Sequence, residues 1–570
     1  MRPWSPRNSD NALIRYSRRN EARKSIIINM KSFKHYILIL AISSIPFIAV
    51  FSTPLMIHTH DGPMHIARIP AYFKALTQGG ILPRWAGDLN FGYGMPLFNF
   101  YYHLPYLLGS FFVALGMNLT WTFKLSLLVS FLLSGSFMYL FSKEFFKDRN
   151  RAFVATILYQ LAPFHMVDVM VRGDTGELLA MAFLPLTLYF IQRCSIPGIA
   201  IASALMILSH SAISLIYFSV AIVFIVFFTP NTKKKIQAGI GLGTGLLLTS
   251  FYWIPALLER KYTYGDIFMK GMFKSHFSPI LNFFIPNLTN SPALQTGGVD
   301  ISFGLMQTII LCVALWKFLK NKIVRFSLIL TVGSLIIMTS PSTFLWEHVS
   351  LLRAFQFPWR FLTVTIFSLS LLGGAVLIKK TTPTYIYVII ILITILSSLT
   401  YWRPPLGYDN IHDRDYWNYP LDTTYFGETD LRWSAGHANA YPTNPFEIIG
   451  GKGIIQNPIK KQTNHTFTVH ADTDVQILDN TQYYPGWRVY SDTTKIPIEF
   501  QDQNHRGIIT FRLPAGAHHV TVSFGETPLR LIADGISVIT LAVLLFLLTR
   551  HSRAGGNPAH FTSGSPRSRG

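Results

Sequence analysis

The sequence contains few charged residues. Only 14% of its 570 residues are Asp, Glu, Lys or Arg, whereas soluble domains contain roughly 25%. Half of the residues are hydrophobic, and Phe alone occurs 45 times. Apolar runs of about 20 residues, long enough to cross a bilayer, recur along the chain. This composition excludes an ordinary soluble protein and predicts a polytopic α-helical membrane protein.

Cysteines and common catalytic motifs are also scarce. The two cysteines are Cys194, at the end of an expected helix, and Cys312, inside an expected span. Residues 402–528 contain none, so disulfide bonds do not stabilise that region. A Walker motif, a GxSxG elbow, HExxH and CxxC are absent. The sequence therefore gives no support to ATP-driven or hydrolase functions.

Positive charge exceeds negative charge by 21, with 49 Lys and Arg against 28 Asp and Glu. In a soluble protein this excess would suggest a nucleic-acid partner. Here the basic residues occur in tails and short loops between apolar runs, where they set membrane orientation. No basic stripe interleaved with aromatic residues is present. The expected partner is the lipid bilayer, and nucleic acid is not expected.

Hydropathy predicts about twelve transmembrane helices. The expected spans are 35–54, 121–142, 152–171, 177–193, 196–209, 211–229, 236–257, 301–319, 324–341, 360–378, 384–401 and 530–549. One alternation of sides places both termini and the basic groups around Lys143, Lys234 and Lys320 in the cytoplasm. The protein is then a multi-pass protein of the inner (cytoplasmic) membrane.

Two apolar segments differ in length from an ordinary transmembrane span. Leu104–Leu115 is apolar but short, and counting it as a span would move Lys143–Arg151 outside. We therefore expect an interfacial or re-entrant helix there. Gly198–Phe228 is too long for one ordinary span, and we divide it at His210–Ser211. A single long tilted helix is the alternative, and it would invert the topology downstream.

The region before the last span is expected to be a β-sandwich-like extracytoplasmic domain. Strand-like alternation occurs at Thr466–Ala471, Val475–Asp479, Trp487–Ser491, Ile508–Leu513 and His518–Phe524. The expected segments are a basic disordered tail (1–34), a transmembrane core (35–401) with its first exterior loop (55–120), the β-rich domain (402–528), a final transmembrane helix (529–550) and a disordered tail (551–570).

The first exterior loop contains the most informative residues. Asp61 follows the first span, and a helix that begins there places Asp61 and His65 on one face. An acid and an imidazole at the membrane surface can serve as general base and orienting group. The alternative is that Asp61 only caps the helix. His58 and His60 add metal-ligand types, but their spacing is no strong metal signature.

A second group of charges lies in the short turn RGDTGE. Arg172, Asp174 and Glu177 are costly near lipid unless they are paired or face a cavity. Arg172 would contact an anionic phosphate, and Glu177 would hold a sugar hydroxyl or a metal. The alternative is a solvated turn with an Arg172–Asp174 pair, in which Glu177 only complements the helix dipole.

Further candidates lie on the same exterior side. His210 is at the tip of an apolar hairpin, where a packing role and a functional role are both open. Arg353, Gln356 and Arg360 lie in the segment RAFQFPWRFL, where arginine suits either phosphate binding or interfacial anchoring. Of these, Gln356 and Arg360 join Arg172, Asp174 and the first-loop Arg84 as candidate substrate-binding residues. The candidate catalytic residues are Asp61, His65, Glu177 and His210.

Several segments resemble a known family. They are DGPMHIAR (61–68), LPRWAGDLNFGYGMPLFNFYYHLPYLLG (82–109), RGDTGE (172–177), LSH (208–210), FQFPWRF (355–361), YYPGWRVYSD (483–492), LPAGAHHVTVSF (513–524) and TPLRLIADGIS (527–537). They resemble bacterial 6-pyruvoyl-tetrahydropterin synthase-related membrane proteins and their YfhO-type relatives. The first loop also looks like that of GT-C glycosyltransferases. The pterin label implies no pterin chemistry, because no zinc-binding pterin-synthase pattern is present.

The GT-C resemblance implies a polyprenyl-phosphate sugar donor and an inverting transfer at the outer membrane face. By position, Asp61 would be the first-loop carboxylate that acts as base or metal ligand. Asp61 is followed by Gly62 and Pro63, so a DxD pair is absent, which favours a base without a metal. No cofactor is expected, and a divalent metal is the alternative.

The predicted function is transfer of a sugar to an envelope glycan or lipid acceptor. Arg172 and Arg360 would stabilise the leaving phosphate, and Asp61 would accept the proton of the acceptor hydroxyl. A transporter or flippase of lipid-linked glycan is the main rival. It would show inverted helix repeats, and we find none. A non-catalytic envelope scaffold is the third alternative.

Overall fold

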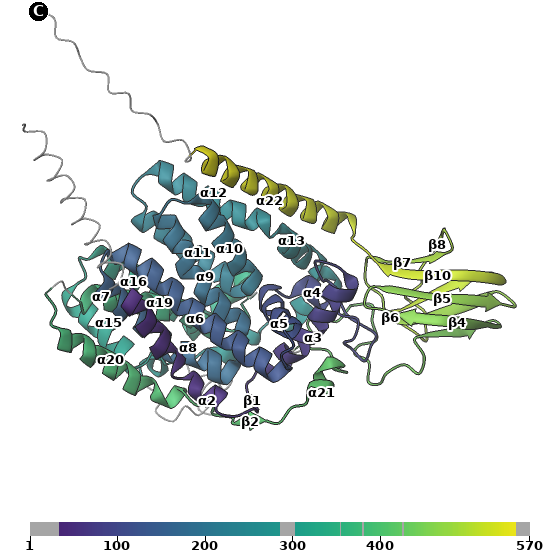
Figure 1. Cartoon of the computed structure of the whole chain (residues 1–570), viewed down its shortest axis with the longest axis horizontal. Helices are drawn as coiled ribbons and strands as arrows, with labels where there is room; N and C mark the ends of the chain where they lie inside the picture. Colours follow the sequence, from purple (N-terminus) through teal and green to yellow (C-terminus); the bar gives the residue numbers. More distant parts are fainter. Residues whose placement is uncertain (1–32, 286–301, 354, 379–380, 425–426, 555–570) are drawn as a thin grey trace, which may run out of the picture.

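The protein consists of a large helical body and a β domain at one end (Figure 1). The computed structural model describes residues 33–285, 302–353, 355–378, 381–424 and 427–554. Almost all of the predicted N-terminal tail therefore lies outside the described residues. Of the predicted disordered tail 551–570, the first four residues belong instead to the last helix, α22 (Pro528–Ala554), and the others lie outside the described residues. The helices share one extensive apolar core.

Six helical segments within the described ranges are long and apolar enough to cross a membrane. They are α6 (Leu119–Phe146), α9 (Thr175–Gln192), α11 (Ser211–Phe228), Pro358–Val376 (η8 and α19, Leu362–Val376), Thr384–Tyr401 (α20, Thr384–Ser398, and η9) and Pro528–Thr549 within α22. Each coincides with one of the expected spans. The hydropathy pattern thus identifies these six correctly.

Three further expected spans are helix pairs with a sharp bend. They are α7 (Arg149–Gln160) with Pro163–Arg172, bent by 49°; α12 (Thr232–Leu248) with Ser250–Tyr262, bent by 69°; and α16 (Lys322–Met338) with Ser340–His348, bent by 81°. Pro163 is the first residue and Pro341 the second residue of the second half of two of these pairs, and proline cannot continue the hydrogen-bond ladder of a preceding helix. With each pair counted as one span, the described residues contain nine.

The expectation of about twelve full spans is therefore too high. The other three coincide with short apolar helices, Phe33–Ser44, α10 (Ile196–Ser209) and α15 (Leu305–Lys317). At 1.5 Å per residue, 14 residues cover about 21 Å of a hydrocarbon core of about 30 Å. Hydropathy counts apolar residues and does not detect a helix that ends early. The segment expected to be interfacial forms the short helix α5 (Leu104–Ala114).

The division at His210 is confirmed. Helix α10 ends at Ser209 and α11 begins at Ser211, with His210 between them in an extended conformation. Its Nδ1 accepts a hydrogen bond of 3.3 Å from the backbone N–H of Ile213. The imidazole therefore caps α11 in the way that Asn and Ser cap other helices.

The β domain contains two antiparallel sheets. One has the strand order β4-β5-β10-β7-β8, and the other has the order β3-β6-β9. The strands are β3 (Phe446–Gly450), β4 (Gly453–Lys460), β5 (Asn464–Ala471), β6 (Val475–Gln482), β7 (Trp487–Ser491), β8 (Thr494–Ile496), β9 (Ile508–Leu513) and β10 (Gly516–Phe524). All five predicted strands are confirmed, whereas β3, β4 and β8 were not predicted.

Side chains from both sheets form one core, as in a sandwich. Phe467 and Val520 of the larger sheet pack in the same cluster as Ile477 and Phe511 of the smaller sheet. Trp85 of the first loop joins this cluster. In Figure 1, α3 (Gly62–Gly79), α4 (Leu97–Phe100) and α5 lie between the helical body and the sheets. The first loop therefore connects the two parts of the protein.

The segment before β3 crosses the first loop as a strap, which we define as residues 408–424 and 427–438. It begins with β2 (Tyr408–Asp409), which pairs antiparallel with β1 (Met56–Ile57). After α21 (Asp413–Trp417), Lys74 Nζ donates to the carbonyl oxygen of Trp417 at 2.6 Å. These contacts fasten the strap to the loop that carries the first candidate residues.

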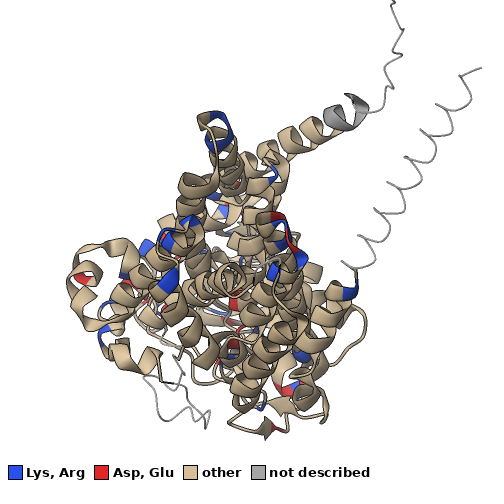
Figure 2. Ribbon diagram, turned by 90° about the vertical axis from the view of Figure 1, so that its left-hand side faces the viewer, with Lys and Arg blue, Asp and Glu red and all other residues tan. Residues whose placement is uncertain are grey.

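The face opposite the β domain is basic. In Figure 2, which views the molecule from its helical end, Lys and Arg predominate over Asp and Glu on the ribbon. Helix α22 runs from the β domain toward that end, beside α12 and α13 (Ser250–Leu258) (Figure 1). The end of the helical body that faces the viewer in Figure 2 is therefore basic.

Within the strap, one histidine, His437, contacts two aspartates, Asp422 and Asp430. His437 Nε2 lies 2.9 Å from Asp430, and its Nδ1 contacts Asp422. These hydrogen bonds raise the pKa of His437 to about 10. Because the folded pKa lies above the unfolded value, the stabilisation is complete below about pH 6.5 and is lost as pH rises through about 10.

We therefore expect His437→Gln to lower the melting temperature more at about pH 6 than at about pH 10. Thermal unfolding of the purified protein across this range measures the difference from wild type. The control is His470→Gln, an exposed residue of β5, which should show no such pH trend. A difference for His437→Gln that stays constant over the range would contradict the expectation.

Candidate functional site

Two backbone segments hold Asp61 and Arg172 side by side. The N–H of Asp61 donates to the carbonyl of Arg172 at 2.8 Å, and the N–H of His60 donates to that of Val171 at 2.9 Å. Arg172 ends the π-helical turn η1 (Asp168–Arg172), and Gly173 follows with φ 68°. A Cβ at Gly173 would collide with Thr59 Oγ1, so the approach requires glycine.

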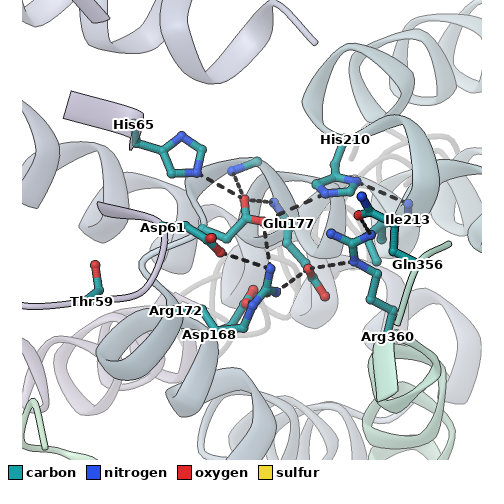
Figure 3. Close-up of polar contacts among 12 residues, drawn as sticks. Thr59, Asp61, His65, Asp168, Arg172, Glu177, His210, Ile213, Gln356 and Arg360 are labelled. Atoms are coloured by element: carbon teal, nitrogen blue, oxygen red, sulfur yellow. Dashed lines mark hydrogen bonds and ion pairs between the residues drawn. The ribbon is translucent and has the colours of Figure 1, made fainter. Parts of the chain in front are cut away.

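The guanidinium of Arg172 contacts four carboxylates (Figure 3). Its Nη2 lies 3.1 Å from Asp61 Oδ2 and 3.1 Å from Asp174 Oδ2. Its Nη1 lies 2.7 Å from Asp168 Oδ1 and also contacts Glu177 Oε2. We call these five residues the charge cluster. The predicted Arg172–Asp174 pair exists, but its side chains are only 5% and 4% exposed, so the turn is not solvated.

Asp61 does not act as a helix cap. Its carboxylate makes no capping hydrogen bond to α3, and Thr59 Oγ1 instead accepts from the N–H of Gly62 at 3.1 Å. Pro63 lies in the first turn, as predicted, and the N–H of His65 donates to the carbonyl of Asp61 at 3.0 Å. The side chain of Asp61 is therefore available to the charge cluster.

Asp174 has a structural role as well as a place in the cluster. Its Oδ1 accepts from the N–H groups of Gly176 and Glu177, each at 2.9 Å, and so caps α9. His65 Nε2 lies 3.6 Å and His210 Nε2 lies 3.8 Å from the same carboxylate. These separations exceed hydrogen-bond length. Both imidazoles nevertheless face the cluster, and His210 lies against Tyr102 with ring centroids 4.9 Å apart.

The segment 355–361 supplies a second guanidinium. Arg360 Nε lies 3.9 Å from Glu177 Oε2, while its Nη1 donates to Gln356 Oε1 at 3.0 Å and to the carbonyl of Phe355 at 2.9 Å. The ring of Trp359 faces the guanidinium of Arg172 at 4.7 Å. This cation–π contact packs the segment against the charge cluster.

Negative charge exceeds positive charge at this site. Four carboxylates face the guanidinium groups of Arg172 and Arg360. Asp168 Oδ2, Glu177 Oε1 and Arg360 Nε are buried and have no hydrogen-bond partner among the described residues. Unpaired buried groups are costly. The site therefore has capacity for additional polar partners.

A cavity of about 820 Å³ adjoins the charge cluster. Ligand sites commonly measure about 300 to 1,000 Å³. Its polar lining at the cluster includes Asp61, His65, Arg172, Asp174, His210, Gln356 and Arg360. Its apolar lining comes largely from α11 and from α13 (Ser250–Leu258), including Leu215, Phe218, Trp253, Ala256 and Leu257. The cavity thus joins an ionic region to an apolar one.

The residues fit a metal ion poorly. Asp174, Glu177 and His210 each offer a ligand atom, and these atoms lie within 4.8 Å of one another. However, Asp174 Oδ1 caps α9, and Arg172 occupies Asp174 Oδ2 and Glu177 Oε2. A guanidinium thus stands among the oxygens that a cation would need. Of the first-loop ligand types, His58 pairs at 2.9 Å with Asp409.

The structure brings most of the predicted residues together but not all. Arg84 lies away from the lining described above, where it pairs with Glu526 at 2.9 Å and Asp534 at 2.7 Å. Arg353 donates to the carbonyl of Trp346 at 3.2 Å. Neither arginine belongs to the described lining of the cavity.

Arg84 belongs to a junction between the β domain and the last helix. Nearby, Arg530 of α22 makes bonds of 3.0 Å to Glu259, which also accepts from Tyr484 at 2.8 Å and Asn99 at 2.8 Å. All four of these side chains are buried. The junction therefore fixes the orientation of the β domain relative to α22.

Sequence reasoning missed Asp168, Arg68 and Glu428. Asp168 lies four residues before Arg172, a spacing that places two side chains on one helical face, so it could have been found. Arg68 lies three residues after His65 on α3 and could have been found in the same way. Glu428 is in the strap, where no periodic pattern marks it.

Residues 98–404, more than half of the chain, match the model of the 6-pyruvoyl-tetrahydropterin synthase related domain, which is described as a membrane protein. The chain belongs to this family. It is therefore a multi-pass membrane protein, as its spans indicate. No curated protein matches the chain.

Solved structures show a weaker likeness. The cryo-EM structure of the arabinofuranosyltransferase AftD from Mycobacteria has 15% identity and a TM-score of 0.43, covering 66% of this chain and 27% of that chain. The apo crystal structure of the Archaeoglobus fulgidus oligosaccharyltransferase has 13% identity and a TM-score of 0.44, covering 73% and 62%. The chain thus spans about a quarter of the first protein and less than two thirds of the second.

Removing the central guanidinium should be strongly destabilising. Arg172→Gln would leave buried carboxylates without their counter-ion, a loss on the order of 3 to 5 kcal/mol. Adding Glu177→Gln should recover part of it by removing one of those charges. Thermal unfolding in detergent measures both effects.

The matched control is Arg193→Gln. Arg193 also faces an acid, Glu144 at 3.8 Å, but its side chain is 56% exposed. Its replacement should cost about 0 to 1 kcal/mol. Equal losses for the two arginines would show that burial of the charge cluster contributes nothing.

Proposed function

We propose that this protein is a membrane glycosyltransferase of the GT-C type. It transfers a sugar from a polyprenyl-phosphate donor to an envelope acceptor at the outer face of the cytoplasmic membrane. The observation that carries the proposal is the contact of Asp61 with Arg172, 3.1 Å apart, in one cavity with Arg360 and an apolar wall. Transfer from a lipid-linked phosphosugar requires a carboxylate as base for the acceptor hydroxyl, a cation for the phosphate and an apolar surface for the lipid tail.

Asp61 is the best general base among the carboxylates. Its side chain is 28% exposed, whereas those of Asp168, Asp174 and Glu177 are at most 4% exposed. Only an accessible carboxylate can reach the proton of an incoming hydroxyl. The other three acids hold Arg172 in place and thereby orient Asp61. Asp61 is thus the proposed catalytic residue.

Arg360 is the better phosphate ligand of the two arginines. The terminal nitrogens of Arg172 are occupied by four carboxylates, whereas Arg360 Nε has no hydrogen-bond partner among the described residues. Charge-assisted hydrogen bonds from arginine suit phosphate oxygens. Arg172 keeps its place in the charge cluster, where it holds Asp61, and the charge on the leaving phosphate is stabilised by Arg360. His65, His210 and Gln356 line the cavity and position the sugar.

The reaction is a direct displacement. The acceptor oxygen forms a bond to the anomeric carbon, and the bond from that carbon to the phosphate oxygen breaks. The electron pair stays with polyprenyl phosphate, whose charge Arg360 stabilises, and the acceptor proton passes to Asp61. The apolar lining formed by Leu215, Phe218 and Leu257 accommodates the first part of the lipid tail.

We further propose that the β domain is extracytoplasmic. The basic face opposite the β domain supports this orientation (Figure 2), because Lys and Arg concentrate on the cytoplasmic side. Reporter fusions test it. A fusion after Lys234, at the start of α12, should report the cytoplasm, and one after Asn504, between β8 and β9, should report the outside. Two fusions on the same side would contradict the orientation.

The catalytic proposal predicts that Asp61→Asn lowers transfer by about a hundredfold or more, since general-base catalysis contributes about 10² to 10⁴. The measurement is transfer from a radiolabelled polyprenyl-phosphate sugar by purified protein in lipid nanodiscs. Asp472→Asn, an exposed aspartate of the β domain, is the matched control and should retain full activity. Transfer that is unaffected by Asp61→Asn would remove Asp61 from the mechanism.

A further inference from the structure

The cavity has a second polar wall, separate from the charge cluster. Its residues are Arg68 of α3, Tyr101 after α4, and Glu428 and Thr429 of the strap, and all four line the cavity. Arg68 lies seven residues after Asp61, which on a helix corresponds to about 10 Å along the axis. The second wall therefore lies about two helical turns from the proposed base.

Internal contacts give this wall a fixed shape. Arg68 Nη1 donates to Tyr106 Oη at 3.0 Å, and its Nε donates to Thr423 Oγ1 at 3.1 Å. Its guanidinium lies 4.0 Å from the ring centre of Tyr101. Tyr101 Oη donates to Glu428 Oε1 at 2.8 Å. The strap and the first loop are thus joined at the cavity surface.

One polar atom of the wall lacks a partner. Thr429 is 4% exposed, and its Oγ1 makes no hydrogen bond to the described residues. Leaving a buried hydroxyl unpaired is unfavourable. A hydroxyl has both donor and acceptor capacity, so its natural partner in the cavity is another hydroxyl group.

The wall does not suit an anion. The guanidinium nitrogens of Arg68 donate to Thr423 and Tyr106, and the carboxylate of Glu428 brings a negative charge to the same wall. Arg260, which also lines the cavity, pairs with Asp266 at 2.7 Å. Besides Arg68, the wall consists of a carboxylate, a threonine hydroxyl and a tyrosine side chain. This combination suits a neutral molecule rich in hydroxyl groups.

We infer that the wall formed by Arg68, Tyr101, Glu428 and Thr429 is the acceptor subsite and that it binds a neutral saccharide. The inference rests on the proposed function and names its acceptor class. Phosphate of the donor lies at Arg360, and the acceptor sugar lies against the strap, with its attacking hydroxyl directed toward Asp61. The strap is then the part of the chain that determines acceptor choice.

Binding of hexyl β-D-glucopyranoside to the full-length protein in nanodiscs tests the subsite without requiring turnover. Trp253 and Trp359 line the cavity, so tryptophan fluorescence serves as the readout. The wild type should show saturable binding. Glu428→Gln should weaken it by about tenfold, the effect of losing a hydrogen bond to a charged group. Thr429→Val, which keeps the side-chain shape, should weaken it severalfold.

Two controls make the result specific. Glu499→Gln removes an exposed carboxylate of the β domain and should leave glucoside binding unchanged. Hexyl phosphate, a probe of equal chain length, should bind without dependence on Glu428 or Thr429. Wild type that shows no saturable binding of the glucoside, or binding equal in wild type, Glu428→Gln and Thr429→Val, overturns the subsite.

Cleavage of the polyprenyl-phosphate sugar donor is measured separately from glucoside binding. Release of polyprenyl phosphate by the wild-type protein, with and without the glucoside, reports glycosyl transfer. Intact and Glu428-dependent glucoside binding without any release would overturn the transferase proposal and support a saccharide-binding wall. Release that the glucoside never alters, together with binding that ignores both variants, would overturn the subsite and leave the transferase in place.

Discussion

The arrangement of the site depends on one guanidinium, that of Arg172. Asp61 comes from the first loop, Asp168 from the same π-helical turn, and Asp174 and Glu177 from the start of α9. A planar guanidinium with several fixed donors can hold several carboxylates in a defined geometry, which a lysine cannot do. The separate segments are therefore held at defined positions, and together they form the polar part of the cavity lining.

The four carboxylates of the charge cluster differ in how deeply they are buried. Three of its carboxylates are almost fully enclosed, and one, Asp61, remains partly open to the cavity. Enclosed charges require compensation, and here most of it comes from a side chain rather than from solvent. The accessible acid is thereby held in one orientation beside Arg172. Arg360 approaches from a different segment, and its Nε has no hydrogen-bond partner among the described residues.

Much of the site could be predicted from the sequence, because charged residues in short turns between apolar runs have few reasons to be there. Arg172 and Glu177 were predicted on that ground, Asp61 because it follows the first span, and Arg360 because it begins an apolar run. These four residues meet in the structure. Arg84 was also predicted as a substrate-binding residue, but it lies at the junction with α22, where it pairs with Asp534. Only three-dimensional placement separates the two cases.

The parts of the fold that the sequence did not predict also have physical explanations. Strand β4 was missed because most of its side chains are exposed, and β8 because it has three residues. The number of spans was overestimated because hydropathy does not record where a helix bends or stops. Glu428 gave no signal, since the strap owes its shape to contacts with distant residues such as Tyr101.

The order of the partners of Arg172 along the chain has a consequence for biosynthesis. Asp168, Asp174 and Glu177 all lie within five residues of it. A nascent segment that emerges from the ribosome already contains the counter-ions of its own arginine, so Arg172 reaches the translocon together with three of its four carboxylate partners. Arg360 and the strap are synthesised much later. The most hydrophilic element of the interior can therefore enter the lipid phase before the rest of its surroundings exists.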